Sequence, residues 1–266
     1  MIGNPFSPFY FDARREGRPR AAAHAAVNVA LYGPRQSRWA LTEGMAPHRT
    51  RDAMWLGRSS LAWCGDALSI EIDERCAPWP RRLQGRLTVR PTLFDGEPRA
   101  LDASGRHTWT PLAPLARVDV ELFEPSLRFR GHGYLDHNVG HEPLEAAFRS
   151  WRWSRVEGGG RADVAYEVTT RDDEVRRVDL SFDALGAHER APSVSTTLPG
   201  TRWWLPRVAR GDSVTRVVRT LEDTPFYARS EIATEKSRGV HEVLDLDRFV
   251  APWVRRIVPM RMRRVG

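Results

Sequence analysis

The chain has 266 residues, of which 41% are hydrophobic and 9% aromatic, so it can bury a substantial core as one large or two small domains. This composition excludes general disorder, and no window approaches the ~18 to 20 apolar residues that span a bilayer. Of the 41 basic residues behind the net charge of +7, all but Lys236 are Arg. This bias indicates a GC-rich genome rather than phosphate binding, and without a nucleic-acid motif we expect no nucleic-acid partner.

The N-terminal sequence contains no apolar run of the kind that forms the core of a signal peptide. Cys64 and Cys76 are too few for a disulfide framework or a zinc ribbon, so we interpret them as free thiols in a reducing compartment. Together these features predict a cytoplasmic protein.

Alternation of apolar and polar residues with a period of two dominates the chain and predicts half-buried strands. A polar turn at residues 171–174 separates two such segments, which is a hairpin signature. Strands are expected at residues 25–32, 38–42, 67–74, 86–91, 116–124, 127–134, 150–156, 164–168, 178–182, 214–221 and 228–234. Many short strands between Gly, Pro and Asp turns indicate an all-β sandwich or barrel. A boundary near residue 124 would divide the strands into two comparable domains, 1–124 and 125–266.

One helix is predicted near the C-terminus, at residues 244–258, where Leu246, Val250 and Trp253 share a side with two further apolar residues. Pro252 predicts a kink there or a helix that starts at this residue. Six Arg and no acidic residue follow from position 248 to the end. The segment therefore suits either adsorption to an anionic bilayer surface or packing on a barrel with solvated arginines.

Chemistry-bearing residues concentrate in GRHTWTPLAP, at 105–114, and RGHGYLDHNVGHEPLE, at 130–145. His107 and Trp109 are two apart in the first segment, as are Tyr134 and Asp136 in the second. Because alternate residues of a strand point to the same face, each pair can line one side of a cavity. The two segments predict an acid embedded in aromatic side chains.

Asp136 is the first candidate for catalysis, because desolvation between rings disfavours its anion and makes it a neutral proton donor. The alternative is a carboxylate that braces a turn. His107 could orient that acid, hold a water or carry a proton, or it could be an ordinary histidine beside a turn. Trp109 and Tyr134 could stabilise a cation through their ring faces or simply pack a core.

Trp151 and Trp153, also two apart, are expected to extend the apolar wall as substrate-binding residues. Residues 132–142 contain a plausible ligand set for zinc or iron, namely His132, Asp136, His137, His141 and Glu142. Their spacing is poor for zinc or iron, so no metal is expected. The chain also has no nucleophile motif and no glycine-rich phosphate loop, so no cofactor is expected.

The chain resembles the carotenoid 1,2-hydratases, also called hydroxyneurosporene synthases, in an ordered series of motifs from about Asn4 to Phe249. They are GNPFSPFYFDARREG, NVALYG, RWALTE, LGRSSLAW, LSIEIDE, GRLTVRP, HTWTPLAPLARVDVEL, GHGYLDHNVGHEPLE, FRSWRWSRV, TPFYARS and GVHEVLDLDRF. The resemblance implies two lipocalin-like β-domains and a cofactor-independent hydro-lyase. It implies that Asp136 is the catalytic acid, supported by Tyr134, His107 and Trp109.

The implied substrates are an acyclic carotenoid, such as neurosporene or lycopene, and water. Neutral Asp136 would protonate C2 of the terminal double bond, and water would capture the tertiary cation at C1. Substrate delivery implies a cytoplasmic protein associated peripherally with the inner or photosynthetic membrane. Two alternatives stay open: a lipocalin-like isoprenoid cyclase, and a non-catalytic carotenoid or lipid carrier.

Overall fold

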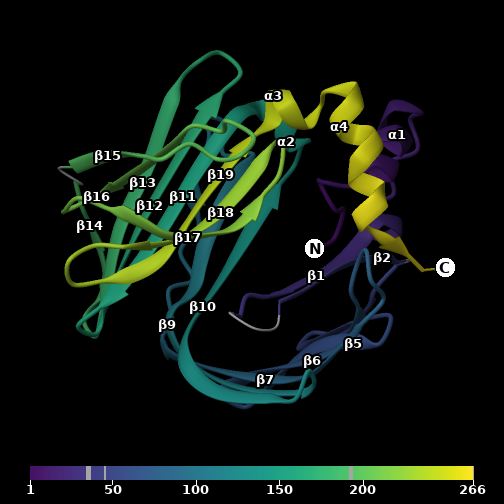
Figure 1. Cartoon of the computed structure of the whole chain (residues 1–266), viewed down its shortest axis with the longest axis horizontal. Coiled ribbons are helices and arrows are strands. Elements are labelled where there is room, and N and C mark those ends of the chain that lie inside the picture. Colours follow the sequence, from purple (N-terminus) through teal and green to yellow (C-terminus); the bar gives the residue numbers. More distant parts are fainter. Residues whose placement is uncertain (34–36, 45, 192–193, 266) are drawn as a thin grey trace. The chain divides into compact units, whose positions relative to one another are not determined.

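The computed structural model describes residues 1–33, 37–44, 46–191 and 194–265, and strands dominate it (Figure 1). Two compact units emerge from its contacts. The first comprises Met1–Pro91, Ala116–Gly133 and Arg255–Gly266, and the second comprises Thr92–Leu115 and Tyr134–Val254. The chain passes between them along β9 (His107–Glu124) and β10 (Leu127–Gly140).

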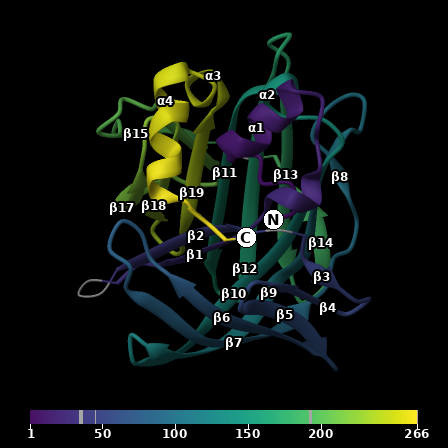
Figure 2. The same cartoon turned by 90° about the vertical axis from the view of Figure 1, so that its right-hand side faces the viewer.

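The first unit contains two sheet regions. Besides parts of β9 and β10, these sheets contain β1 (Ala25–Leu31), β2 (Arg38–Gly44), β3 (His48–Arg49), β4 (Ala53–Leu56), β5 (Ser59–Cys64), β6 (Ala67–Arg75), β7 (Arg82–Leu93) and β20 (Arg263–Arg264). β1 pairs with β2, while β3 to β7 form a run of antiparallel neighbours (Figure 2). Alternate residues of these strands point inward, and Ile72, Leu83 and Leu122 pack together in one core cluster.

A short N-terminal helix, α1 (Pro8–Arg15), has no counterpart among the predicted elements. Ser7 caps it by accepting a hydrogen bond from the backbone N–H of Tyr10, and Pro8 occupies its first turn. The Ser-Pro pair was the available sequence signal, but eight residues are too few to show a helical period. A 3-10 turn, η1 (Ala21–His24), precedes β1.

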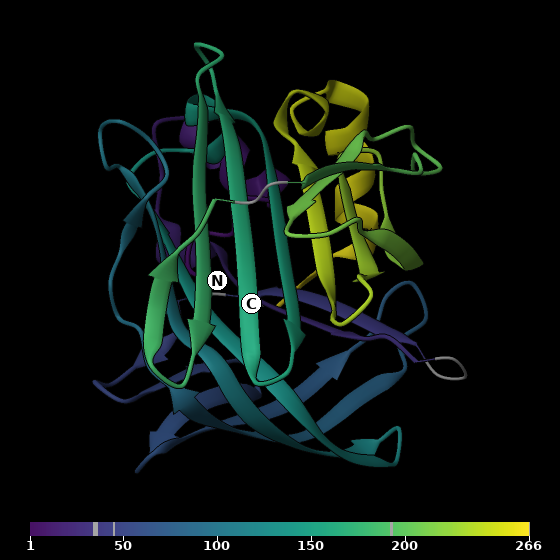
Figure 3. The same ribbon diagram turned by 90° about the vertical axis from the view of Figure 1, so that its left-hand side faces the viewer.

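The second unit is built on a seven-stranded antiparallel sheet in the order β14-β13-β12-β11-β19-β18-β17. Its strands are β11 (Phe148–Gly158), β12 (Arg161–Thr170), β13 (Val175–Asp183), β14 (Gly186–Glu189), β17 (Arg216–Asp223), β18 (Tyr227–Ala233) and β19 (Arg238–Asp245). Two further pairs lie outside this sheet: β15 (Val194–Leu198) pairs with β16 (Arg207–Gly211), and β8 (Arg99–Ala100) pairs with β9. Figure 3 shows β11 to β14 side by side in teal and green. The predicted hairpin is confirmed as β12 and β13.

The strand β12 is buried on both faces, with Val164, Tyr166 and Val168 on one and Ala165 and Glu167 on the other. Such a strand can carry functional side chains on one face while the opposite face completes a core. The face that carries Tyr166 is the one that positions the candidate site.

In place of the single predicted C-terminal helix, the structure has two short α-helices and a 3-10 turn. Leu244 and Asp245 still belong to β19, and Asp245 caps α3 (Leu246–Phe249) by accepting from the N–H of Arg248. A second helix, α4 (Pro252–Ile257), begins at the proline, followed by the 3-10 turn η2 (Val258–Arg261). The predicted start at 244 is wrong because pairing with β11 and β18 extends the strand through this position. In the described part of the chain, no helix is long and apolar enough to cross a bilayer.

Candidate active site

Three of the predicted residues meet in one hydrogen-bonded triangle within the second unit. Trp109, on β9, donates from Nε1 to Oδ2 of Asp136 at 2.9 Å and to the Tyr134 hydroxyl oxygen at 3.1 Å. Tyr134 donates its own hydroxyl proton to the same Oδ2 at 3.0 Å. The spacing of two residues between Tyr134 and Asp136 on β10 turns both side chains toward Trp109, as predicted.

The hydrogen bonds to Asp136 are unevenly divided between its two oxygens. Both neutral donors point to Oδ2, whereas Oδ1 has no hydrogen-bond partner among the described residues. Within the same residues Asp136 forms no ion pair with any Arg or Lys. A protonated carboxyl group fits this pattern, with the proton on Oδ1 and the carbonyl lone pairs of Oδ2 accepting two donors.

Burial favours the neutral form of Asp136. Trp109 is fully buried, and Tyr134 and Asp136 are partly buried. Desolvation raises the pKa of Asp136, the hydrogen bonds from Trp109 and Tyr134 lower it, and the charge of Glu242 raises it, with a net pKa above the ordinary value. Burial, and then the charge of Asp136, raises the pKa of the Tyr134 phenol, so Tyr134 remains a donor.

A second layer of aromatic rings comes from the sheet. Trp153 on β11 lies directly opposite Tyr166 on β12, so both project from one face. The Trp153 ring centroid is 5.4 Å from that of Tyr134, and the Tyr166 centroid is 5.6 Å from that of Trp109. The acid is thus backed by four aromatic side chains.

His107 is fully buried but makes its hydrogen bonds elsewhere. Its Nδ1 lies 2.9 Å from Oδ2 of Asp102, and its Nε2 lies 3.1 Å from the backbone oxygen of Glu142. Burial would raise the pKa of Asp102, but hydrogen bonds from Ser104, from His107 and from two backbone N–H groups outweigh it and lower that pKa. Neither ring nitrogen of His107 is directed by a hydrogen bond to Asp136.

The two predicted wall residues, Trp151 and Trp153, project from the same face of β11 and have different neighbours. Trp153 joins the site through Tyr134, whereas Trp151 has Val168 and Leu244 as its cross-strand neighbours. Sequence reasoning missed Tyr166 and Glu242, the two cross-strand neighbours of Trp153. Only the strand register brings these residues together, and no spacing in the sequence shows it.

The potential metal ligands at residues 132–142 do not form a metal-binding cluster in the described ranges. His132, His137 and His141 are exposed, and no group of three or more His, Cys, Asp or Glu in the described ranges lies close enough together to hold a metal ion. Both cysteines are free thiols, Cys64 exposed and Cys76 buried.

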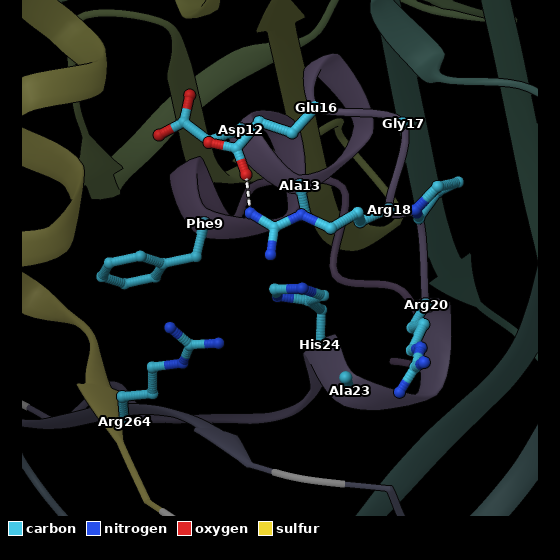
Figure 4. Close-up of a pocket in the computed structure, with 11 residues that line it drawn as sticks. Phe9, Asp12, Ala13, Glu16, Gly17, Arg18, Arg20, Ala23, His24 and Arg264 are labelled. Carbon is cyan, nitrogen blue, oxygen red and sulfur yellow. Dashed lines mark hydrogen bonds and ion pairs between the residues drawn. The ribbon is translucent and has the colours of Figure 1, made fainter.

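The first unit contains a pocket of about 820 Å³ that includes none of the predicted site residues (Figure 4). In this view Arg18 and His24 point toward the same space, with Phe9 and Arg264 opposite them. His24 Nδ1 lies 3.0 Å from a fully buried carboxylate oxygen of Glu43. Because the same Oε1 of Glu43 also lies 3.7 Å from Nε of Arg264, we interpret His24, Glu43 and Arg264 as a structural polar network.

Comparison with known proteins shows similarity along the whole chain. The profile of the family described as "Carotenoid hydratase CrtC" matches residues 1–266. An acyclic carotenoid 1,2-hydratase of Thiocapsa roseopersicina is 44% identical over 278 residues, which cover 100% of this chain and 68% of that protein. One of Cereibacter sphaeroides is 36% identical over 274 residues, covering 99% of this chain and 96% of that protein.

Among solved structures, the crystal structure of CghA with Sch210972 matches 86% of this chain and 82% of its own with a TM-score of 0.58. At 12% identity this likeness shows the fold alone. With the strand content of the chain, it confirms the predicted all-β, lipocalin-like fold class with a short C-terminal helix.

Proposed function

The chain belongs to the carotenoid hydratase CrtC family, and from this premise we propose that it adds water across the terminal C1,2 double bond of an acyclic carotenoid. The relatives named for this activity align with essentially the whole chain. The observation that carries the proposal is Asp136, a desolvated carboxyl group with two neutral donors on one oxygen and none on the other.

The first step is proton transfer from Oδ1 of Asp136 to C2 of the substrate. The π electrons form the new C2–H bond and leave a tertiary cation at C1. As the carboxylate forms, the hydrogen bonds that Trp109 and Tyr134 already donate to Oδ2 stabilise its negative charge without reorganisation. The site is therefore poised to make a weak acid reactive at the moment of transfer.

The second step is capture of the cation by water. Before capture, the ring faces of Trp109 and Tyr134 can stabilise the cation by roughly 0.5 to 2 kcal/mol per ring in a desolvated site. Trp153 extends this aromatic surface through its contact with Tyr134, and Trp151 continues it along β11. We assign both tryptophans to binding of the polyene end.

We consider two roles for His107. It can hold the start of β9 in place, as an anchor, or it can return a proton to Asp136, as a relay. Its hydrogen bonds to Asp102 and Glu142 favour the anchor, because they occupy both ring nitrogens. As an anchor it positions Trp109, two residues further along the strand.

We propose that hydration needs no metal or coenzyme, because a neutral carboxylic acid can supply the electrophile that the alkene requires. Dialysis against a strong chelator is expected to leave the turnover rate unchanged. A loss of turnover that zinc restores would contradict this proposal.

The decisive experiment uses Asp136→Asn, with Asp119→Asn as a matched control at a partly exposed position of β9, where the carboxylate pairs with Arg90 and Arg130. Each variant is expressed in cells that accumulate lycopene or neurosporene, and products are analysed for a mass gain of one water. Asp136→Asn is expected to fold and to lose activity by at least about 100-fold, while the control retains it. In deuterated water the product should carry deuterium at C2.

The outcomes separate the candidate functions. Hydration by a folded Asp136→Asn variant at the wild-type rate would remove Asp136 from the mechanism. A rearranged product without added water would favour a cyclase, and stoichiometric carotenoid binding without product would favour a carrier.

We also propose that the protein associates peripherally with the inner or photosynthetic membrane, where its hydrophobic substrate resides. Support comes from residues 255–261, where Ile257 is 37% and Met260 is 75% exposed beside the exposed Arg256 and Arg261. Apolar and cationic side chains together suit an anionic interface.

A further inference from the structure

We propose that Glu242 is a second catalytic carboxylate, the base that takes the proton from the attacking water, so that acid and base in this site are different groups. The inference rests on the proposed hydration and deepens it. Nothing in the sequence pattern points to Glu242, which lies more than a hundred residues beyond Asp136.

The strand register places Glu242 beside the triangle. On β19 it lies directly opposite Trp153 of β11, whose ring packs 5.4 Å from that of Tyr134. Tyr134 in turn donates to Asp136. Directly opposed residues of an antiparallel pair have Cβ atoms about 4.5 to 5.5 Å apart, so Glu242 is a near neighbour of the aromatic surface proposed to face the cation.

The two carboxyl groups have opposite electrostatic environments. Arg229 donates to Oε1 of Glu242 from Nε at 2.9 Å and from Nη2 at 2.5 Å, an ion pair that stabilises the carboxylate. Asp136 has neutral donors only. A site in which one carboxyl group has only neutral donors and the other is paired with a guanidinium has the division between acid and base that hydration needs.

Glu242 also has an oxygen available for water. Both donors from Arg229 are directed to Oε1, and Oε2 has no hydrogen-bond partner within the described ranges. The side chain is only 16% exposed, so a water held there would be largely shielded from bulk solvent. The negative charge of Glu242 contributes to the raised pKa of Asp136, which accords with the proximity that the strand register gives the two groups.

The step balances as follows. After the Asp136 proton has formed the C2–H bond, a lone pair of the water oxygen forms the C1–O bond. The water O–H bond then breaks, its electron pair stays on the new hydroxyl oxygen, and the proton goes to Oε2 of Glu242. Proton exchange with solvent then restores neutral Asp136 and ionised Glu242, and no oxidant or reductant is needed.

The test separates protonation of the alkene from capture by water. Glu242→Gln keeps an oxygen that accepts from Arg229 but has no basic carboxylate. In deuterated water this variant is expected to hydrate about 100-fold more slowly than the wild type. It should still exchange deuterium into recovered carotenoid, because the cation formed by Asp136 returns to the alkene by losing a proton.

Two further variants complete the design. Glu242→Asp retains a carboxylate and should recover part of the hydration rate. Glu231→Gln is the matched control, since Glu231 on β18 also pairs with arginine, at 3.5 Å from Arg238, and should hydrate like the wild type. Asp136→Asn should neither hydrate nor exchange.

Hydration by Glu242→Gln at the wild-type rate would overturn the inference and leave the proposed function intact. Loss of both hydration and exchange in a folded Glu242→Gln variant would also overturn it, because Glu242 would then act on the protonation step. If the wild type neither hydrates nor exchanges, the proposed function itself fails.

Discussion

At Asp136, reactivity depends on two opposing effects that the same fold provides. Burial favours the neutral acid, while the N–H of Trp109 and the O–H of Tyr134 favour its anion. Under the proposed mechanism, burial thus favours the neutral acid before the reaction, and the two donors stabilise its conjugate base as it forms. Either effect alone would give an unreactive carboxylic acid or a permanently ionised one.

Removing one donor tests this balance. Tyr134→Phe is expected to raise the pKa of Asp136 further, because one hydrogen bond to the carboxylate is lost. A weaker acid protonates the alkene more slowly, so we expect turnover to fall by roughly 10- to 100-fold, since a hydrogen bond to a charged group contributes about 1.5 to 3 kcal/mol. Steady-state hydration measures the effect, and an unchanged rate would contradict it.

Another buried group, His241, makes stability dependent on pH. Burial, and then the charges of Arg207 and Arg152, lowers the pKa of His241 to about 3. The unfolded chain binds this proton near the ordinary pKa of 6.5, so its stabilising contribution is complete above that pH and is lost as pH falls toward the folded value.

Between pH 6.5 and 5 the His241 contribution should fall by about 1.6 kcal/mol, with a slope that approaches about 1.4 kcal/mol per pH unit well below pH 6.5. Urea unfolding at both pH values measures the loss. In His241→Gln the free energy of unfolding should lack this part of its dependence on pH. The variant should also be less stable at neutral pH, because the Ser154 hydroxyl loses its hydrogen bond to His241. An identical slope in variant and wild type would contradict the assignment.

Site residues could be predicted from the sequence where they lie close together along the chain. The grouping of Tyr134 with Asp136 could be predicted because a strand repeats every two residues, and Trp109 follows from the same rule on β9. Tyr166 and Glu242 could not be predicted, because they approach through the pairing of β12 and β19 with β11.

At the scale of elements, strand positions were predicted better than their ends. The strand expected at 127–134 continues to Gly140, since its polar residues line the site instead of ending the strand. The strand β19 was not predicted, because Gly239 and three charged residues obscure its alternation. Pairing on both sides, with β11 and β18, forms the strand despite this weak local signal.

Gly239 is needed in β19 because the neighbouring strand β11 leaves no room for a side chain at this position. A Cβ at this position would lie 1.8 Å from the backbone oxygen of Arg155 and 2.7 Å from Cα of Val156, both on β11. Gly239→Ala must therefore separate β19 from β11, at a cost of about 2 to 3 kcal/mol. Thermal unfolding measures this, with Gly200→Ala as the control, because a Cβ at Gly200 meets nothing within 4 Å. Equal melting temperatures would contradict the expectation.

At the scale of the whole molecule, fold and function are supported by different comparisons. The likeness to CghA persists at 12% identity because alternating strands can build the same architecture from many sequences. The likeness to the carotenoid hydratases extends over essentially the whole chain at 36% and 44% identity, and only that second kind of similarity bears on chemistry. The predicted domain boundary at residue 124 remains a prediction.

The substrate of a carotenoid hydratase does not dissolve in water, so the proposed membrane association concerns the surface of the whole molecule rather than the site alone. Near an anionic surface each Arg contributes about 1 kcal/mol, so Arg256→Gln combined with Arg261→Gln should weaken binding to phosphatidylglycerol vesicles by about 30-fold. Arg51→Gln, at a side chain that is 95% exposed, is the control and should bind like the wild type. Added salt should weaken wild-type binding, and neutral phosphatidylcholine vesicles should bind poorly. Equal vesicle affinity of the double variant and the wild type in a sedimentation assay would show that other residues contact the bilayer.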